Sequence, residues 1–594
     1  MVPLVSGRTQ RSRMSQVLRR SLIFALLCFY SVAQSSAPAA TSTSVQQPSN
    51  SAPSAAPQPS STANFSSAGS EVVANPIGAA RAFYSKGDFE HALAKYQECL
   101  KDNPKSPDAY AGLVHVYLKE KRVDEAAQAA EQGLARTNSP RVRVARAEVW
   151  FRQGRITDAE KEWVEVVNSG YPEARAYLGL ARVRDALALY QGAVKMIVKA
   201  HEIDSSDPDI EEAWVGTLSR DERIKYLETS LAGDNTWDTD KRSDIASYLE
   251  FLKERARQNI KPCRLVSKFK ATETPLVRLL NDPEHLRGYG LSVSLNGHKN
   301  SLMLDTGASG ILINRGVAQH AGISKISETK VWGVGKKGRR DAFFGVADSI
   351  KIGELEFQNC PVEVMESRSV AGEDGLIGTD VFEDFLVDVD FPDEKFKLSE
   401  LPKRPGETGQ NIALKSGNDD DDSSESENTA SDSKSAKSDS KTPASSGPRD
   451  RYIAPEMQDY TRVFRFGHDL LVPTSIGKVP EKLFLLDTGS LTNLISPAAA
   501  REVTKVHGDS DTILEGISGR VDKVYSANKA VLTFGRLRQE NQDMTAFDTT
   551  PLSDDVGTEV SGFLGFVMLR MLDIKIDYRD ALVDFHYDAK RFGR

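Results

Sequence analysis

The sequence predicts a multidomain protein in which an all-α repeat solenoid is followed by two all-β domains. Three observations support this fold class. The chain has 594 residues, a helical pattern recurs about every 34 residues in its first half, and one stretch of strand-like sequence occurs twice in its second half. A chain of this length is too long for a single hydrophobic core, so roughly three or four domains are expected.

Residues 1–33 have the pattern of an export signal. Arginines between Arg11 and Arg20 precede a short apolar stretch that ends in small residues, with cleavage expected after Ala33. The apolar stretch is shorter than the roughly 20 residues that a membrane-spanning helix needs. We therefore expect an exported protein, secreted or periplasmic, with no stable membrane span after cleavage; an uncleaved anchor is the alternative.

Two segments, 34–74 and 403–455, are expected to be disordered linkers. Both are rich in small and polar residues and cannot bury enough apolar surface to order themselves. The second contains an acidic run, Asp419 to Asp422; calcium binding there is conceivable, but the spacing of an EF-hand loop is absent. The net charge is −8 and no basic stripe stands out, so nucleic acid is not an expected partner.

The four cysteines, Cys28, Cys99, Cys263 and Cys360, are widely separated. Their spacing matches neither a disulfide scaffold nor a zinc site, so we expect no metal and no cofactor. One bridge between Cys263 and Cys360 stays open, but nothing in the sequence supports it.

Residues 75–260 carry a repeated helical pattern. Alanines recur at spacings of 34, 33 and 34 residues, at Ala92, Ala126, Ala159 and Ala193. A small Ala lets two antiparallel helices approach closely, a Gly ends the first helix of each pair, and a Pro stops the second. The prolines that would close successive units are Pro104, Pro140, Pro172 and Pro208.

This pattern resembles the tetratricopeptide repeat (TPR), whose period is about 34 residues. The resemblance implies a solenoid whose concave groove holds a peptide or protein partner, capped by the helical residues 208–258. We expect the repeats to fold alone and to contribute affinity rather than chemistry. A generic helical bundle is the alternative.

Residues 265–402 and 456–594 look like two copies of one strand-rich domain. Leu304-Asp305-Thr306-Gly307 matches Leu486-Asp487-Thr488-Gly489, at an offset of 182 residues. Downstream, Gly333 pairs with Gly516 and Gly378 with Gly565, at offsets of 183 and 187. A duplicated domain with small changes of length explains the pattern.

Two copies of hydrophobic-hydrophobic-Asp-Thr-Gly, each with matched downstream glycines, resemble the retropepsin-like aspartic peptidases and the two lobes of pepsin-like enzymes. The resemblance implies that Asp305 and Asp487 are the catalytic pair. It also implies supporting roles for further residues. The catalytic loops would contain Thr306, Gly307, Thr488, Gly489 and Ser490. The flaps would contain Trp332, Gly333, Gly335, Gly516 and Gly519. Gly378 and Gly565 would pass beneath the loops.

Two carboxylates held this close cannot both ionise, so the pair is expected to share one proton and to need no metal. The halves differ after the last glycine, where the first has Thr379-Asp380 and the second Phe566-Val567. The first has Ala308 after Asp-Thr-Gly and the second has Ser490, which we expect to donate a hydrogen bond to the pair. This predicts a pH optimum from mildly acid to near neutral.

The sequence thus favours an aspartic-type endopeptidase that acts on protein or peptide substrates. We expect a monomer, because two diverged halves in one chain would pair with each other. A non-enzymatic peptide-binding scaffold built on peptidase-like lobes is the alternative, and self-cleavage in the linker, between residues 403 and 450, is a third interpretation. Asp-Thr-Gly also occurs as a simple turn, but burying two unpaired carboxylates between apolar runs would be costly.

Overall fold

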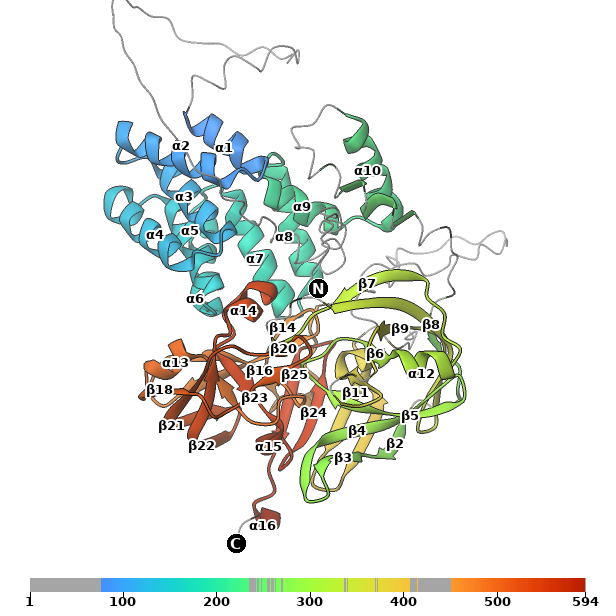
Figure 1. The fold of residues 1–594 in the computed structure, drawn as a ribbon. Helices are drawn as coiled ribbons and strands as arrows, with labels where there is room; N and C mark the ends of the chain where they lie inside the picture. Colours follow the sequence, from blue (N-terminus) through green and yellow to red (C-terminus); the bar gives the residue numbers. More distant parts are fainter. Residues whose placement is uncertain are drawn as a thin grey trace, which may run out of the picture.

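The computed structural model describes residues 76–233, most of 261–405, and 450–592, together with isolated residues between these ranges. The predicted signal and first linker lie outside the described residues, and so does most of the second linker. In Figure 1 the helical repeats lie at the top, the first β lobe (residues 264–400) at the lower right and the second β lobe (residues 455–592) at the lower left.

Antiparallel helix pairs build the predicted solenoid. Its helices are α1 (Pro76–Ser85), α2 (Phe89–Asp102), α3 (Pro107–Lys119), α4 (Val123–Thr137), α5 (Pro140–Arg152), α6 (Ile156–Asn168), α7 (Ala174–Ala186), α8 (Tyr190–Ile203), α9 (Pro208–Gly216) and α10 (Arg220–Ala232). The turn inside each of the first four pairs contains one residue with positive φ. These residues are Gly87, Lys121, Gly154 and Ala188, which keep the repeat spacing.

The four periodic alanines are buried at the contacts between paired helices, as predicted. One detail is corrected. Pro140 and Pro208 are the first residues of α5 and α9, so they open the next helix rather than stop the previous one. Proline suits the first helical position because its missing N–H has no partner there and its φ is already helical.

An ionic network links the first helices of successive pairs across the face that they share. Arg175 of α7 pairs with Asp207 and Asp209, and Lys119 of α3 reaches Asp209 at 2.5 Å. The Tyr84 hydroxyl of α1 donates to the same Asp209 at 2.7 Å. A peptide lying along this face would compete with these internal contacts, so the expected groove is partly filled by the protein's own side chains.

The first lobe is a nine-stranded sheet in the order β1-β9-β6-β10-β5-β4-β8-β7, with β3 paired to β4. Its elements are β1 (Arg264–Leu265), β3 (Val277–Asp282), β4 (His285–Leu295), β5 (His298–Asp305), β6 (Ile311–Asn314), α12 (Arg315–His320), β7 (Ser327–Val331), β8 (Arg340–Ile352), β9 (Leu355–Met365), β10 (Gly375–Gly378) and η2 (Thr379–Phe382). The apolar residues of β5, β6 and β10 are almost all buried, which explains their nearly continuous hydrophobic sequence.

The second lobe repeats this arrangement in the order β14-β15-β16-β23-β17-β22-β21-β18. Its elements are β14 (Phe464–Phe466), β15 (Asp469–Ile476), β16 (Lys482–Leu486), β17 (Leu494–Ile495), α13 (Pro497–Arg501), β18 (Val506–Asp509), the hairpin β19 (Glu515–Gly516) and β20 (Gly519–Arg520), β21 (Val524–Phe534), β22 (Leu537–Phe547), α14 (Thr550–Val556), β23 (Gly562–Leu564) and α15 (Phe566–Leu569). Parallel pairing sets Ile377 beside Leu304 in the first lobe and Leu564 beside Leu486 in the second. The two copies inferred from the sequence therefore also pair their equivalent strands in the same register.

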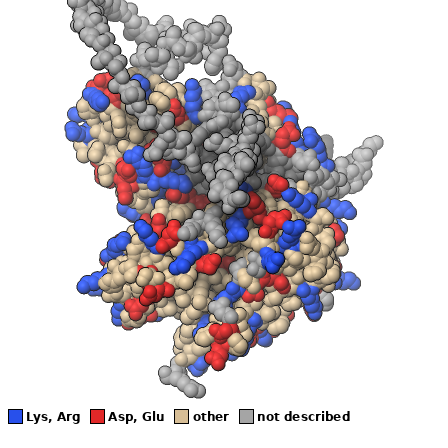
Figure 2. All heavy atoms as spheres, in the orientation of Figure 1, with Lys and Arg blue, Asp and Glu red and all other residues tan. Residues whose placement is uncertain are grey.

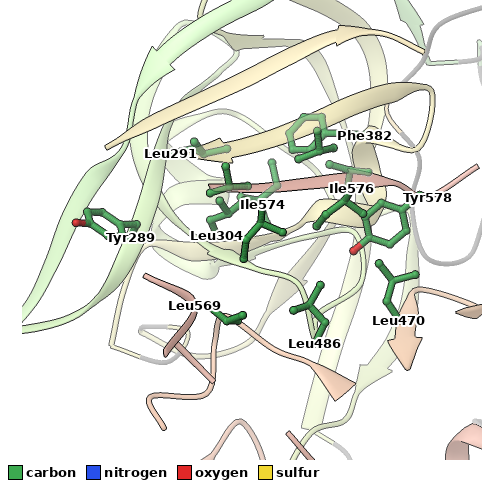
Figure 3. Packing of buried hydrophobic residues seen from close by; sticks show 14 of the residues in the cluster. Tyr289, Leu291, Leu304, Phe382, Leu470, Leu486, Leu569, Ile574, Ile576 and Tyr578 are labelled. Carbon is green, nitrogen blue, oxygen red and sulfur yellow. The ribbon is translucent and has the colours of Figure 1, made fainter. Parts of the chain in front are cut away.

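A six-stranded sheet joins the lobes within this one chain. Its strands are β13 (Thr461–Arg462), β25 (Leu582–His586), β24 (Asp573–Asp577), β11 (Phe385–Asp390), β12 (Lys395–Glu400) and β2 (Thr272–Pro275), in that order. Strand β11 of the first lobe pairs antiparallel with β24 of the second. Figure 3 shows the buried core at this joint, where Leu304 and Phe382 lie near Leu486, Ile576 and Tyr578 of the other lobe.

The repeats and the second lobe share a hydrophobic core. Phe151 of α5 packs against Phe466 of β14, with ring centroids 6.1 Å apart, in a buried cluster that draws on both units. Next to it, the Thr558 hydroxyl donates to the Phe151 carbonyl at 2.6 Å, and the Glu559 N–H donates to the Arg152 carbonyl at 2.9 Å. This shared core argues against the expectation that the repeats are a self-contained unit.

Two further links fix the chain around the lobes. Cys263 and Cys360 form a disulfide, which resolves the pairing that the sequence left open. On the second lobe, the fully buried Asp580 accepts hydrogen bonds from the Arg404 side chain at 2.6 Å and from the Tyr452 N–H at 2.8 Å. The two flanks of the predicted second linker are therefore anchored on one carboxylate.

Candidate active site

Asp305 and Asp487 lie at equivalent points of the two lobes, where a buried strand runs into a tight loop. Asp305 is the last residue of β5, and Asp487 directly follows β16. Asn314 and Ser496 cap the short helices beyond each loop by accepting hydrogen bonds from the N–H groups of Val317 and Ala499.

Thr306 and Thr488 lock the two loops together through a reciprocal set of hydrogen bonds. The Thr306 N–H donates to Thr488 Oγ1 at 3.0 Å, and the Thr488 N–H donates to Thr306 Oγ1 at 2.9 Å. Each hydroxyl in turn donates to a carbonyl of the other lobe, at Leu486 and Leu304. The two Thr residues are only 2% and 4% exposed, so water cannot replace these bonds.

This grip holds the two half-buried carboxyl groups close enough to hydrogen-bond to each other. Burial raises the pKa of Asp305, against the opposing effect of the Gly307 N–H, which donates to it at 2.9 Å. Burial and then repulsion from Asp305 raise the pKa of Asp487 well above its ordinary value. The pair therefore holds one proton at a pH where isolated carboxyls would hold none.

Glycine is required in both loops because the partner carboxyl occupies the space of a side chain. A Cβ on Gly307 would lie 2.8 Å from the Asp487 Cγ, and one on Gly489 would lie 2.4 Å from the Asp305 Oδ2. Gly378 and Gly565 run directly beneath the loops, as expected. A Cβ on either would lie within 2.3 Å of a loop carbonyl oxygen.

The two predicted flap segments meet each other. The Ser518 N–H donates to the Val334 carbonyl at 3.0 Å, and the Ser518 hydroxyl donates to the Gly338 carbonyl at 2.7 Å. Gly335 and Gly519 pack so closely that a Cβ on Gly335 would lie 2.2 Å from the Gly519 carbonyl oxygen. Further residues of these segments are Trp332, which is half-buried, and the contact glycines Gly333 and Gly516.

One predicted interaction is wrong. The Ser490 hydroxyl donates to the Thr492 carbonyl at 3.0 Å, inside its own loop, and not to the carboxyl pair. Of the Ser490 donors, the backbone N–H is the one that reaches the pair, at 2.9 Å from the Asp487 Oδ1. A backbone N–H does not depend on the side chain, so the Ala308–Ser490 difference no longer supports a prediction about pH.

Asp380 is a site residue that the sequence reasoning missed. Its carboxylate accepts hydrogen bonds from the Gly310 N–H, at 3.0 and 3.1 Å from the two oxygens, and from the Ser309 hydroxyl at 3.1 Å. The signal was available, since Asp380 stands where the second lobe has Val567. A polar residue that is present in only one copy of a duplicated core is a candidate for a functional role specific to that copy.

Comparison with known proteins identifies the two kinds of domain. Residues 291–381 match the family model for aspartyl protease, and residues 83–148 match that for the tetratricopeptide repeat. The first lobe therefore contains a domain similar to aspartyl proteases. The matched range of this protease domain includes Asp305 and Gly378, and the second lobe reproduces the register of its strands.

Two further proteins are similar to parts of this chain. The UBA domain-containing protein Mud1 of Schizosaccharomyces pombe (strain 972 / ATCC 24843) is 27% identical over 125 residues, which are 19% of this chain and 36% of that protein. The chain thus spans about a third of that relative's length. The crystal structure of TTC0263, a thermophilic TPR protein in Thermus thermophilus, has 22% sequence identity and a TM-score of 0.25, and covers 30% of this chain and 98% of that chain.

The described residues offer neither a membrane-spanning helix nor a cluster of three or more His, Cys, Asp or Glu side chains that could hold a metal ion. On the face shown in Figure 2, basic and acidic side chains are interspersed around the visible part of both lobes.

The hydrogen bonds that Thr306 and Thr488 make between the two loops give a first prediction. Thr488→Val keeps the side-chain shape but leaves the Thr306 N–H and the Leu304 carbonyl without their partner. Each unsatisfied buried group costs about 1–3 kcal/mol, so we expect the free energy of unfolding to fall by about 2–4 kcal/mol in a urea titration. Thr488→Ser keeps the hydroxyl and is the matched control, expected to lose about 1 kcal/mol for its missing methyl group. Equal losses of stability in both variants would contradict the role of the Thr488 hydroxyl in holding the two loops together.

Proposed function

We propose that this chain is an exported aspartic-type endopeptidase that hydrolyses peptide bonds with Asp305 and Asp487 as its catalytic pair. The observation that carries the proposal is the carboxyl pair itself, in which each carboxyl lies against the glycine of the other loop and Thr306 and Thr488 lock the two loops together. Two such carboxyls would be too costly to maintain in a mere turn, because burial raises both pKa values and the charged forms repel.

The shared proton supplies an acid and a base in one site. In the proposed reaction the ionised carboxylate takes a proton from a water molecule, whose oxygen attacks the peptide carbonyl carbon. The protonated carboxyl donates its proton to the carbonyl oxygen, which gives a tetrahedral diol. Collapse of the diol breaks the C–N bond while a proton passes to the leaving nitrogen. The roles belong to the pair, since coupled groups titrate together.

The flaps and repeats point to the substrate class. Two glycine-rich segments that meet at Gly335 and Gly519 would cover an extended peptide and exclude water from it. The repeats are a second surface suited to proteins, because stacked helix pairs present broad binding faces. We infer that the substrate is a protein or peptide chain, with the repeats recruiting it or a partner.

Export is part of the proposal. The signal-like pattern of residues 1–33 is supported by the disulfide between Cys263 and Cys360, since disulfides persist mainly in oxidising compartments. N-terminal sequencing of the mature protein should start shortly after Ala33. Recovery of an intact Met1 or Met14 in the mature protein would exclude cleavage.

The activity is tested with a library of peptides prepared from a whole proteome. The wild type should generate new peptide ends, identified by mass spectrometry, and both pepstatin and the Asp305→Asn, Asp487→Asn double variant should remove them. A folded wild type that binds library peptides without cutting them would favour the peptide-binding scaffold instead.

A further inference from the structure

We propose that Asp380 is a positioning residue for the catalytic loop of the first lobe and that its ionised form holds that loop more firmly than its protonated form. This inference rests on the proposed function, because it concerns the loop that begins at Asp305. It goes further by assigning a residue outside the Asp-Thr-Gly motifs and by giving the two lobes different dependence on pH.

The geometry places Asp380 at the far end of that loop. Both carboxylate oxygens face the Gly310 N–H, and one also accepts from the Ser309 hydroxyl. The Gly310 carbonyl accepts from the Gly378 N–H at 2.8 Å, so Gly310 is fixed from both sides. Gly310 has a φ of +68°, a left-handed conformation that such contacts help to maintain.

The second lobe holds its loop without an ionisable side chain. Val567 occupies the position equivalent to Asp380, and it is 42% exposed. The loop is held instead by the N–H groups of Phe566 and Val567, which donate to the carbonyls of Ser490 and Leu491 at 2.7 and 2.9 Å. The two loops that carry the catalytic pair are therefore secured by different chemistry, one ionic and one neutral.

The surroundings of Asp380 allow it to change charge near neutral pH. Its side chain is buried, with 5% exposed, and burial raises its pKa to about 6, against the opposing effects of His468 and the Gly310 N–H. The ionised form accepts all its hydrogen bonds. The protonated form is uncharged and keeps only one oxygen as acceptor, while its O–H faces the Gly310 N–H, so its hold on the loop weakens as pH falls through about 6.

The charged and titratable groups that interact with Asp380 come from the second lobe. They are Arg465 of β14, His468 just before β15, and Tyr578, whose pKa is raised by burial and by Asp380. Arg465 pairs with Glu383 at 2.8 Å, and His468 lies 3.2 Å from Asp469. These side chains therefore also interact with other acids, and burial has the largest effect on the pKa of Asp380.

Protonation of Asp380 is expected to stabilise the folded protein but to lower its activity. A carboxyl whose pKa is raised on folding stabilises the protein in its protonated form, and this contribution is lost as pH rises from about 4 through about 6. Activity needs the ionised form, so the loop is ordered for catalysis over the pH range where Asp380 costs stability.

Asp380→Asn and Asp380→Val separate these effects, with Asp374→Asn as the control. Asp374 also accepts a backbone N–H in the first lobe, from Ser301, but lies outside the catalytic loop. Asparagine is the uncharged counterpart of protonated Asp380 and cannot titrate, so its kcat/KM at pH 7 should fall to about the level that the wild type reaches below pH 6, and the part of the acid limb that Asp380 causes should disappear. Valine removes the acceptor and should lower kcat by about 10- to 100-fold at every pH, since small misplacements of catalytic groups have effects of that size. The control should keep the wild-type acid limb.

A second readout does not depend on catalysis. Between about pH 4 and 6 the unfolding equilibrium of the wild type should depend on pH more steeply than that of Asp380→Asn, by up to about tenfold per pH unit for one proton. An unchanged acid limb in an active Asp380→Asn enzyme would overturn the positioning role, as would identical pH dependence of unfolding. A wild-type protein that cleaves no peptide but shows this difference in unfolding would overturn the proposed function alone. The assignment of Asp380 as the titrating contact of the loop would stand.

Discussion

Replacing either Asp305 or Asp487 by Asn is expected to abolish peptide hydrolysis, with kcat lowered at least about 100- to 10,000-fold. The reason is that the carboxyls of one chain form a single site, joined by the Thr–Thr hydrogen bonds and by the pairing of β11 with β24. Asparagine is nearly the same size but can neither take a proton from water nor donate one as an acid. Peptide hydrolysis by each single variant is measured against the wild type at equal folded concentration.

Two controls separate this result from misfolding and from pairing between chains. Burial raises both pKa values, so each Asn variant should resist denaturant at least as well as the wild type near neutral pH. A mixture of the two single variants should stay inactive if each site forms within one chain. Substantial activity in either variant, or rescue on mixing, would mean that the sites form between molecules.

Phe151→Ala is expected to impair peptide hydrolysis although it lies in the repeats, far from the carboxyl pair in sequence. Phe151 packs on Phe466 of the second lobe, and its carbonyl accepts from Thr558. Truncating a buried Phe costs about 3–5 kcal/mol. Loss of this contact should loosen β14 and, through Val334 and Leu514, which pack against the same cluster, both flap segments.

The matched control for this prediction is Phe83→Ala, in the first helix pair, which packs against a cluster made of repeat residues. Both variants should lower the stability of the solenoid, but only Phe151→Ala should lower cleavage of a short generic peptide. A fragment that starts at Lys261 is likewise expected to be inactive, since it exposes the second lobe's half of the shared core. Full activity in a folded fragment would show that the repeats supply affinity alone.

The sequence predicted those features of the fold that depend on local pattern or on internal duplication. The repeat period located the buried alanines, and the two Asp-Thr-Gly copies located the loops and their glycines, because each of these follows from residue type at a fixed offset. The Ser490 hydroxyl was assigned wrongly, since its choice between the carboxyl pair and Thr492 depends on a side-chain rotamer. No periodicity encodes such a choice.

The features that escaped prediction depend on distance in space rather than in sequence. Phe151 has the sequence context of an ordinary helix core residue, and nothing in its own neighbourhood shows that its partner is Phe466. Cys263 and Cys360 are 97 residues apart and meet only because β1 pairs with β9. Asp380 stands out in the sequence as a difference between the halves, but its partners are backbone groups that become visible only when the loop is folded.

The double anchor on Asp580 bears on how this chain can evolve. Arg404 and Tyr452 are held by the same buried carboxylate, so a single substitution at Asp580 would release two chain segments that are far apart in sequence. Such a substitution takes the acceptor away from both donors, and each unsatisfied buried group costs about 1–3 kcal/mol. Selection is therefore expected to keep an acidic residue at position 580 for as long as both segments dock there.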